Sequence, residues 1–227
     1  MFARMCPDRR ARSLLDRLAP AHRDGLALVL SSALTSGVGL LYWVVAARLF
    51  DPATVGVNSV AISTMMLLAS AAHLNMTYAL LRFVPVAGVR ARPLVAGGYA
   101  VGAGVAALAG TVFAAGAPWW APELVAVAGH GALVAFFALA TPLSAVFVMK
   151  DYVLTGAGRA AVVPAWNLVF SLLKLGLLAA AAALALPGGI AVSWTVATAV
   201  VVVAVNAWLL PAALPRFGAR RRTGRCR

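Results

Sequence analysis

The sequence is poor in acidic residues and in lysine. Its 227 residues include six Asp and Glu against 19 Lys and Arg, and the only lysines are Lys150 and Lys174. No acidic residue falls inside an apolar run of the sequence. Membrane enzymes and carboxylate-coupled transporters both need clustered acidic or histidine side chains at such depths. We therefore expect no enzyme active site, no coupling carboxylate and no cofactor.

Cysteine is equally scarce. Cys6 and Cys226 are the only two, and no spacing of Cys and His typical of a metal site is present. Both fall on the side of the chain expected to be cytoplasmic, where thiols stay reduced. The glycine cluster GAGRA at 156–160 lacks the Gly-Lys-Ser/Thr ending of a P-loop. The sequence thus predicts no disulfide, no metal site and no nucleotide site.

Apolar residues are what the chain has in excess. They make up 63% of the sequence, and the mean hydropathy of +0.93 is far above that of soluble domains. The runs reach the roughly 20 residues that a spanning helix needs, and they are longer than barrel strands. The predicted spans are residues 26–49, 55–81, 94–115, 124–149, 165–186 and 190–210. The predicted fold is all-α, a polytopic membrane protein with a bundle of six transmembrane helices.

Basic residues divide the chain into two sides. They gather before the first run, after the second and fourth, and after the sixth, whereas the other loops hold only Arg48. Because Lys and Arg in short loops stay cytoplasmic, both termini are predicted to be cytoplasmic. The expected division is a basic arm at 1–25, a six-helix lobe at 26–213 and a basic tail at 214–227. The net charge of +13 is then explained by topology and anionic membrane lipids, and no nucleic acid partner is expected.

A charged joint separates the first two runs, in the stretch AARLFDPATVG at 46–56. Asp51 and Pro52 are expected to end the first helix, and Arg48 is expected to extend to the interface. Gly56 is expected to let the second helix begin close to its neighbour.

This joint and the runs beside it carry a resemblance to a known family. The run SSALTSGVGLLYWVVAARLF, the joint DPATVG and the run VNSVAISTMMLLASAAHL resemble the amino-terminal lobe of the multidrug/oligosaccharidyl-lipid/polysaccharide exporter superfamily. Within it, the sequence is most similar to the polysaccharide and O-antigen flippase branch. The resemblance implies one lobe of a two-lobe exporter fold, in the plasma (inner) membrane of a bacterium.

The resemblance also implies a function in export of cell-envelope polysaccharide, such as lipopolysaccharide. In those exporters a lipid-linked oligosaccharide is held in a cleft between two lobes. This sequence has one lobe, so we expect a single lobe or truncated form that pairs with a second lobe or forms a homodimer. The alternative is a non-transporting membrane subunit or scaffold of a polysaccharide synthesis complex.

Lys174 is the one basic residue expected well inside a span. Asn167 and Ser171 precede it by seven and three residues, which places the three on one helix face. A charge at this depth indicates a functional site, here for an anionic headgroup such as a diphosphate. In the alternative interpretation, Lys174 extends to the interface or pairs with a carbonyl inside the lobe.

Other polar residues inside the spans are candidates for further roles. Asn206 is expected to face the same interior as Lys174 and to bind substrate. Because histidine side chains can titrate near neutral pH, His73 is a candidate for proton coupling, or else a hydrogen-bonded packing residue. A stripe of small residues in the first run is expected to serve close helix packing. The stripe comprises Ser32, Thr35, Ser36 and Gly39.

Overall fold

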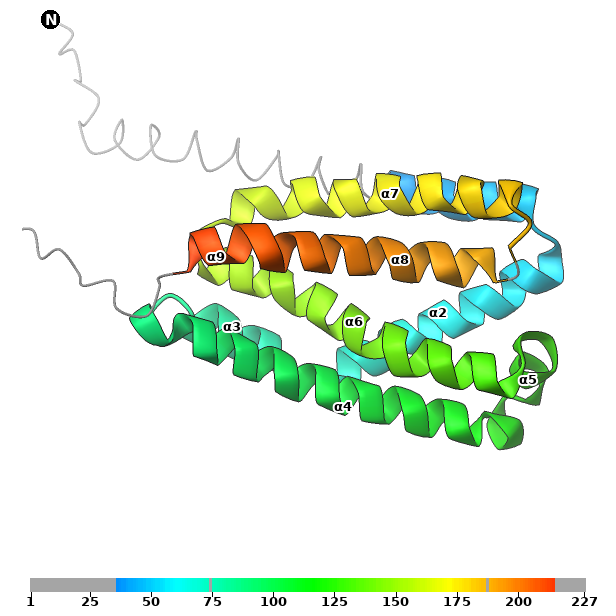
Figure 1. The fold of residues 1–227 in the computed structure, drawn as a ribbon, viewed down its shortest axis with the longest axis horizontal. Coiled ribbons are helices and arrows are strands. Elements are labelled where there is room, and N and C mark those ends of the chain that lie inside the picture. The colour runs from blue at the N-terminus through cyan, green and yellow to red at the C-terminus, as the bar shows by residue number, and fades with distance from the viewer. Residues whose placement is uncertain (1–35, 74, 187, 215–227) are drawn as a thin grey trace, which may run out of the picture.

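The computed structural model describes residues 36–73, 75–186 and 188–214, and within these ranges it contains helices and no strand (Figure 1). A first helical segment, Ser36–Leu49, precedes the labelled elements. The α-helices are α2 (Pro52–Ala72), α3 (Met76–Phe83), α4 (Ala91–Trp120), α5 (Pro122–Ala128), α6 (His130–Gly156), α7 (Val163–Ala183), α8 (Gly189–Ala204) and α9 (Leu210–Ala213). Two short 3₁₀ turns, Gly88–Arg90 and Ala160–Val162, and a π-helical turn, Val205–Leu209, extend them.

Five helical stretches in the described ranges are long and apolar enough to cross a membrane. They are Pro52–Ala72, Gly88–Trp120, His130–Gly156, Ala160–Ala183 and Gly189–Ala212. The all-α fold expected from the sequence is therefore confirmed for the described residues. They include five candidate membrane spans, as expected for a membrane-embedded protein. Only Ser36–Leu49 of the first predicted span is described, so the count of six stays a prediction.

The second predicted span, 55–81, is wrong as one continuous helix. The chain forms α2 and the short α3, with a break between Ala72 and Met76. Asn75 stands in this break with a φ of 59°, the left-handed conformation that asparagine tolerates better than most residues. An apolar stretch therefore contains a turn where hydropathy alone indicates none.

The fourth predicted span, 124–149, is displaced along the chain. Gly129 has a φ of 79° and separates α5 from α6, and α6 then continues to Gly156. Lys150 and Asp151 consequently belong to the last turns of α6, a candidate spanning helix. The placement of these two residues in a loop after the fourth span is corrected by this extension.

Helix α6 lies at the centre of the bundle. It packs against α2, α3, α4 and α8, while α7 packs chiefly against α8 (Figure 1). Small residues allow α4 to approach α6. A Cβ atom added to Gly110 would stand 2.6 Å from the carbonyl oxygen of Phe137, so only glycine fits at this contact.

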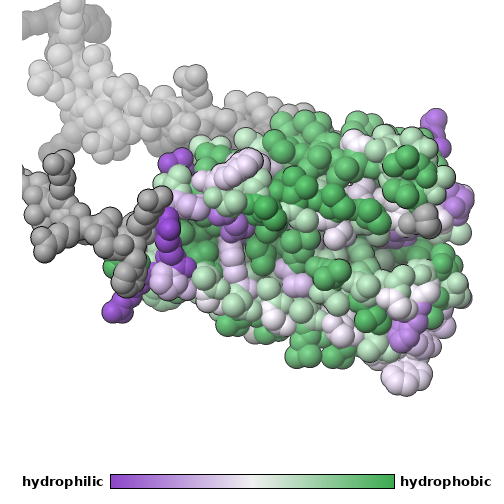
Figure 2. Space-filling model, in the orientation of Figure 1, coloured by the Kyte–Doolittle hydropathy of each residue, from purple (hydrophilic) through white to green (hydrophobic). Residues whose placement is uncertain are grey.

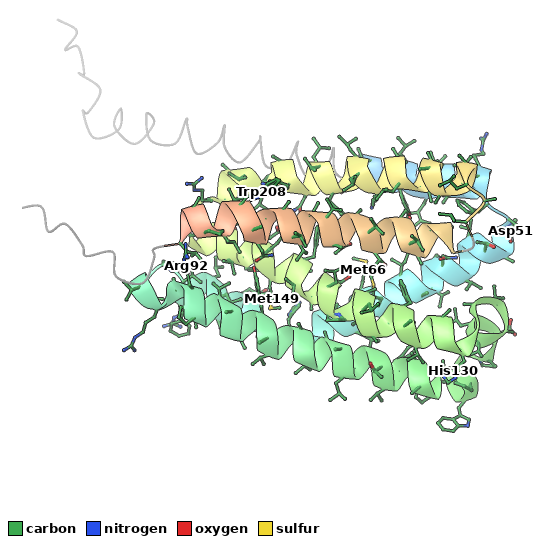
Figure 3. All side chains as sticks on the ribbon, in the orientation of Figure 1. Asp51, Met66, Arg92, His130, Met149 and Trp208 are labelled. Atoms are coloured by element: carbon green, nitrogen blue, oxygen red, sulfur yellow. The ribbon has the colours of Figure 1, made fainter. Side chains whose placement is uncertain are left out.

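Successive long helices run in opposite directions, so every second connection between them lies at the same end of the molecule (Figure 1). Arg92 and Asp51 mark opposite ends in Figure 3, and Arg92 Nη2 donates a 2.7 Å hydrogen bond to the carbonyl oxygen of Pro211. Apolar residues cover most of the visible face between these ends, and hydrophilic residues gather at the ends (Figure 2). This distribution fits a membrane-embedded protein, whereas the cytoplasmic placement of one end stays a prediction.

Several expectations concern residues outside the described ranges. These are the basic arm 1–25, the tail from residue 215 onward, both cysteines, Ser32 and Thr35. Of the small-residue stripe, the structure describes Ser36 and Gly39. A Cβ atom at Gly39 would meet no other atom within 4 Å, so this glycine makes no close helix contact with the described residues.

Candidate functional site

Lys174 of α7 lies inside a cage of three aromatic rings. Its Nζ atom is 4.0 Å from the ring centroid of Trp194 on α8, 4.8 Å from that of Tyr42 and 5.1 Å from that of Phe170. The residue is 4% exposed, and its ammonium makes no hydrogen bond or ion pair with another described residue. The charge is therefore held by aromatic faces from three separate helical segments.

The walls of this cage are fixed by their own contacts. The Tyr42 hydroxyl donates to the carbonyl oxygen of Ile190 at 3.0 Å and lies 3.0 Å from Ser193 Oγ. The rings of Tyr42 and Trp194 meet edge to face with centroids 5.5 Å apart. These contacts hold the segment Ser36–Leu49 against α8, because they join its buried tyrosine to that helix.

Aromatic faces attract a cation but do not satisfy its donors. A desolvated cation–π contact contributes about 2 kcal/mol. An ammonium has three N–H donors, and a buried donor without an acceptor costs about 1–3 kcal/mol. The aromatic rings thus stabilise the charge of Lys174. Its N–H groups have no hydrogen-bond acceptor within the described part of the chain.

A second buried lysine is held differently. Lys150 on α6 is fully buried, and its Nζ lies 2.5 Å from Oδ1 of Asp151 and 3.3 Å from Oδ1 of Asn167. Asn167 Nδ2 donates to the second carboxylate oxygen of Asp151 at 3.1 Å. Lys150 Nζ also lies 3.9 Å from the ring centroid of Phe147. We call Lys150, Asp151 and Asn167 the ion-pair cluster; it joins α6 to α7.

The predicted stripe of Asn167, Ser171 and Lys174 is therefore divided between two environments. Asn167 belongs to the ion-pair cluster and Lys174 to the aromatic cage. Ser171 is buried, and its hydroxyl donates to the carbonyl oxygen of Asn167 at 2.9 Å, a bond within its own helix. The three residues follow the helical spacing, but other helical segments supply partners only to Asn167 and Lys174, and they supply different ones.

Sequence reasoning missed the ion-pair cluster because it ended the fourth span at residue 149. The adjacent Lys150 and Asp151 then appeared to be loop charges. Tyr99 of α4 was missed as well; its hydroxyl is buried without a hydrogen-bond partner among the described residues. One sequence signal was available. No glycine or proline stands between the end of the predicted span at residue 149 and Gly156, so the helix could continue through Lys150 and Asp151.

The remaining candidates have local roles in the structure. Asn206 lies in the π-helical turn, and its amide donates to the carbonyl oxygen of Val202 at 2.8 Å. His73 caps the end of α2, and its Nδ1 atom is buried without a hydrogen-bond partner among the described residues. Substrate binding by Asn206 and proton coupling by His73 remain predictions.

The joint between the first two helical segments is partly as expected. Asp51 is the N-cap of α2 and accepts hydrogen bonds from Thr54 N at 2.8 Å and Thr54 Oγ1 at 2.7 Å, and Pro52 follows as the first helical residue. These bonds hold the pKa of the Asp51 carboxyl below its ordinary value. Arg48 is exposed, and its extension to the membrane interface stays a prediction. The expectation for Gly56 is wrong, because it is exposed and a Cβ atom there would meet nothing within 4 Å.

A cleft of about 1000 Å³ opens near Asp51, between α2, the start of α6, the end of α7 and the start of α8. Its walls are mainly apolar, and Figure 2 shows the surface hollowed at this end of the molecule. The polar residues in its lining are Asp51, Thr54, Asn58 and Thr195. Asn58 joins two of the walls, since its Oδ1 accepts a 3.1 Å hydrogen bond from Ala191 N on α8.

The described residues contain no group of three or more His, Cys, Asp or Glu side chains arranged to hold a metal ion. The functional candidates are therefore the aromatic cage, the ion-pair cluster and the cleft. Comparison of the chain with protein-family models, with curated proteins and with solved structures finds no match.

Proposed function

We propose that the chain is a flippase-like membrane lobe that helps to move a lipid-linked oligosaccharide across a bacterial plasma membrane. The observation that carries the proposal is the state of Lys174. The residue is 4% exposed, and its ammonium is surrounded by aromatic faces and has no hydrogen-bond acceptor among the described residues.

An anionic headgroup supplies what this ammonium lacks. A diphosphate offers several charged oxygen acceptors, and charge-assisted hydrogen bonds are about twice as strong as neutral ones. Lysine suits such a ligand because its ammonium is a compact point charge that can turn toward a phosphate. The three rings keep the charge out of contact with hydrocarbon when no ligand is bound. Lys174 is accordingly the proposed headgroup anchor.

The substrate class and the partner come from the resemblance of the first two helices and their joint. It suggests a saccharide linked to a lipid through a diphosphate, and a cleft formed with a second lobe or a second copy of the chain. The process served is the biosynthesis and export of cell-envelope polysaccharide. Both termini are proposed to lie in the cytoplasm.

A second candidate function follows from a different observation. Lys174 and Ser171 are buried among the helices of the chain itself, as expected for a subunit whose polar residues stabilise its own fold. In this case the chain is a non-transporting scaffold of a polysaccharide synthesis complex. Its Lys174 is then needed for packing and not for export.

The two candidates differ in what a substitution of Lys174 does. We would express the chain, alone and with a candidate second lobe, in a flippase-deficient strain and measure surface polysaccharide. Lys174→Ala should leave expression and insertion nearly unchanged and reduce export at least about tenfold, the effect of losing about 1.4 kcal/mol of headgroup binding. Lys174→Arg should retain part of the export, since the charge survives.

The matched control is Ser171→Ala, which changes a buried polar residue one turn from Lys174 and leaves the charge in place. Export should remain close to wild type in this variant. Normal export by a well-expressed Lys174→Leu variant, in a strain where the wild-type chain restores export, would reject Lys174 as anchor and favour the scaffold.

A further inference from the structure

The cleft near Asp51 has the depth of one membrane leaflet. Its wall on α2 runs from Asp51 to Ala61, ten residues further along the helix. At a rise of 1.5 Å per residue this wall is about 15 Å long. The hydrocarbon core of a bilayer is about 30 Å thick, so the cleft extends from one interface to about the bilayer centre.

Aromatic residues indicate that the mouth of the cleft lies at an interface. Trp119 and Trp120 end α4 at the same end of the molecule as Asp51, and they are 84% and 54% exposed (Figures 1 and 3). Tryptophan is enriched where the hydrocarbon meets the headgroups. The charged joint at Arg48 and Asp51 therefore stands at headgroup level, and the apolar walls lie in the hydrocarbon.

The cleft walls suit a hydrocarbon chain. Most are formed by Ala, Leu, Val and Phe side chains, including Ala132 and Phe136 of α6 and Val192 of α8. The volume of about 1000 Å³ is at the upper end of the range of about 300–1,000 Å³ for ligand pockets. An acyl chain lying along apolar walls gains dispersion contacts with them.

The mouth of the cleft carries one carboxylate, that of Asp51. Asp51 is exposed and its pKa is lowered, so its carboxylate is ionised; each oxygen accepts one hydrogen bond from Thr54 and keeps further lone pairs. A primary ammonium fits this carboxylate, because its N–H groups can donate to the free lone pairs.

We propose that this cleft is a binding site for one zwitterionic phospholipid with a primary amine, of the phosphatidylethanolamine class. Its amine binds Asp51, and one acyl chain lies along α2, α6 and α8. The site is separate from Lys174, which does not line the cleft. It therefore stands whether or not the chain moves a lipid-linked saccharide.

The test uses the full chain purified in detergent and native mass spectrometry to count bound lipid. The probes are phosphatidylethanolamine, phosphatidylcholine and phosphatidylglycerol with identical acyl chains. We expect one phosphatidylethanolamine per chain, bound about tenfold more tightly than phosphatidylcholine, because the quaternary amine has no N–H for Asp51. Phosphatidylglycerol, which lacks the amine, should bind more weakly still.

Two variants locate the site. Asp51→Asn still caps α2, since asparagine is an equally good N-cap, but it should remove the preference for phosphatidylethanolamine. Ala132→Phe places a large side chain in the cleft and should abolish retention of the lipid. Its control is Ala179→Phe on an exposed position of α7 outside the cleft, which should bind lipid as the wild type does. Circular dichroism and gel filtration check the fold of every variant.

Several results would overturn the proposal. They are retention of no lipid by the wild type, preference for phosphatidylglycerol, an unchanged preference in Asp51→Asn, and unchanged binding in a folded Ala132→Phe variant. Conversion of a wild-type dimer to monomer by Ala132→Phe, without loss of bound lipid, would assign the cleft to a second copy of the chain.

Discussion

The two buried lysines show two ways of holding a charge inside a helical bundle. Lys150 is fully buried and has a carboxylate and an amide oxygen as partners. Lys174 is 4% exposed and has three aromatic rings and no acceptor among the described residues. The ammonium of Lys150 has hydrogen-bond acceptors within the protein. The ammonium of Lys174 has none among the described residues, so its N–H groups can donate to a ligand. The lysine without an ion pair is accordingly the better candidate for binding.

The largest expected effect comes from breaking the ion-pair cluster. Asp151→Ala leaves the buried ammonium of Lys150 with Asn167 as its only hydrogen-bond partner, beside the ring of Phe147. Removing one member of a fully buried pair typically costs about 3–5 kcal/mol, and because the Asp151 side chain is 23% exposed we expect a loss toward or below the lower end of that range. Thermal unfolding of the purified chain in one detergent should show the loss as a lower midpoint temperature.

The control for this prediction removes both charges. The double variant Lys150→Met and Asp151→Leu keeps the volume of the pair and leaves no buried charge, so most of the lost stability should return. A double variant as unstable as Asp151→Ala would mean that the cluster stabilises the bundle by shape or by Asn167 alone, and the contrast between the two lysines would fail.

Removing the charge from the aromatic cage should have a smaller effect on stability. Lys174→Met loses a cation–π attraction of about 2 kcal/mol but also removes the desolvation cost of an ammonium without acceptors. We expect the free energy of unfolding to change by less than about 1 kcal/mol in either direction, measured in the same unfolding assay. A loss of about 3 kcal/mol or more would indicate an acceptor for Lys174 in the bundle, and its role as an open donor would be rejected.

The smallest effect is expected at Asp51, a charge that stays in water. Hydrogen bonds from Thr54 lower its pKa from the ordinary value of 3.8. A lowered pKa adds stability that is present above the ordinary value and is lost as the pH falls through the lowered value. The wild-type midpoint temperature should therefore fall slightly in acid below pH 3.8, relative to that of Asp51→Asn.

In that comparison Asp51→Asn is the reference, because a neutral amide caps α2 at every pH. Both proteins should otherwise respond alike to acid. Parallel curves for the two proteins would show that the Thr54 bonds do not couple the charge of Asp51 to folding.

Much of the helical organisation was predictable from hydropathy and turn residues. The spans at 165–186 and 190–210 correspond closely to α7 and to the stretch Gly189–Ala212. Asp51 and Pro52 were expected to end the first helix, and the structure shows that they also begin α2. The turns at Asn75 and Gly129 were not predicted, because each lies in an apolar stretch where a positive φ leaves no trace in hydropathy.

The candidate sites were less predictable, because their members come from different helices. Helical spacing placed Asn167 and Lys174 on one face of α7. It had no means to show that α6 brings an ion pair to the first residue, or that α8 and the segment Ser36–Leu49 bring aromatic rings to the second.

The sequence by itself determined that this protein is a set of apolar helices long enough to span a membrane, with basic residues gathered in alternate loops. Those properties depend on local composition and on the cost of leaving backbone groups unpaired in hydrocarbon. Tertiary structure decided which side chains from other helices surround each buried lysine. Lys150 has its carboxylate partner, Asp151, on its own helix, but packing alone brought Asn167 of α7 to this pair and the rings of Tyr42 and Trp194 to Lys174.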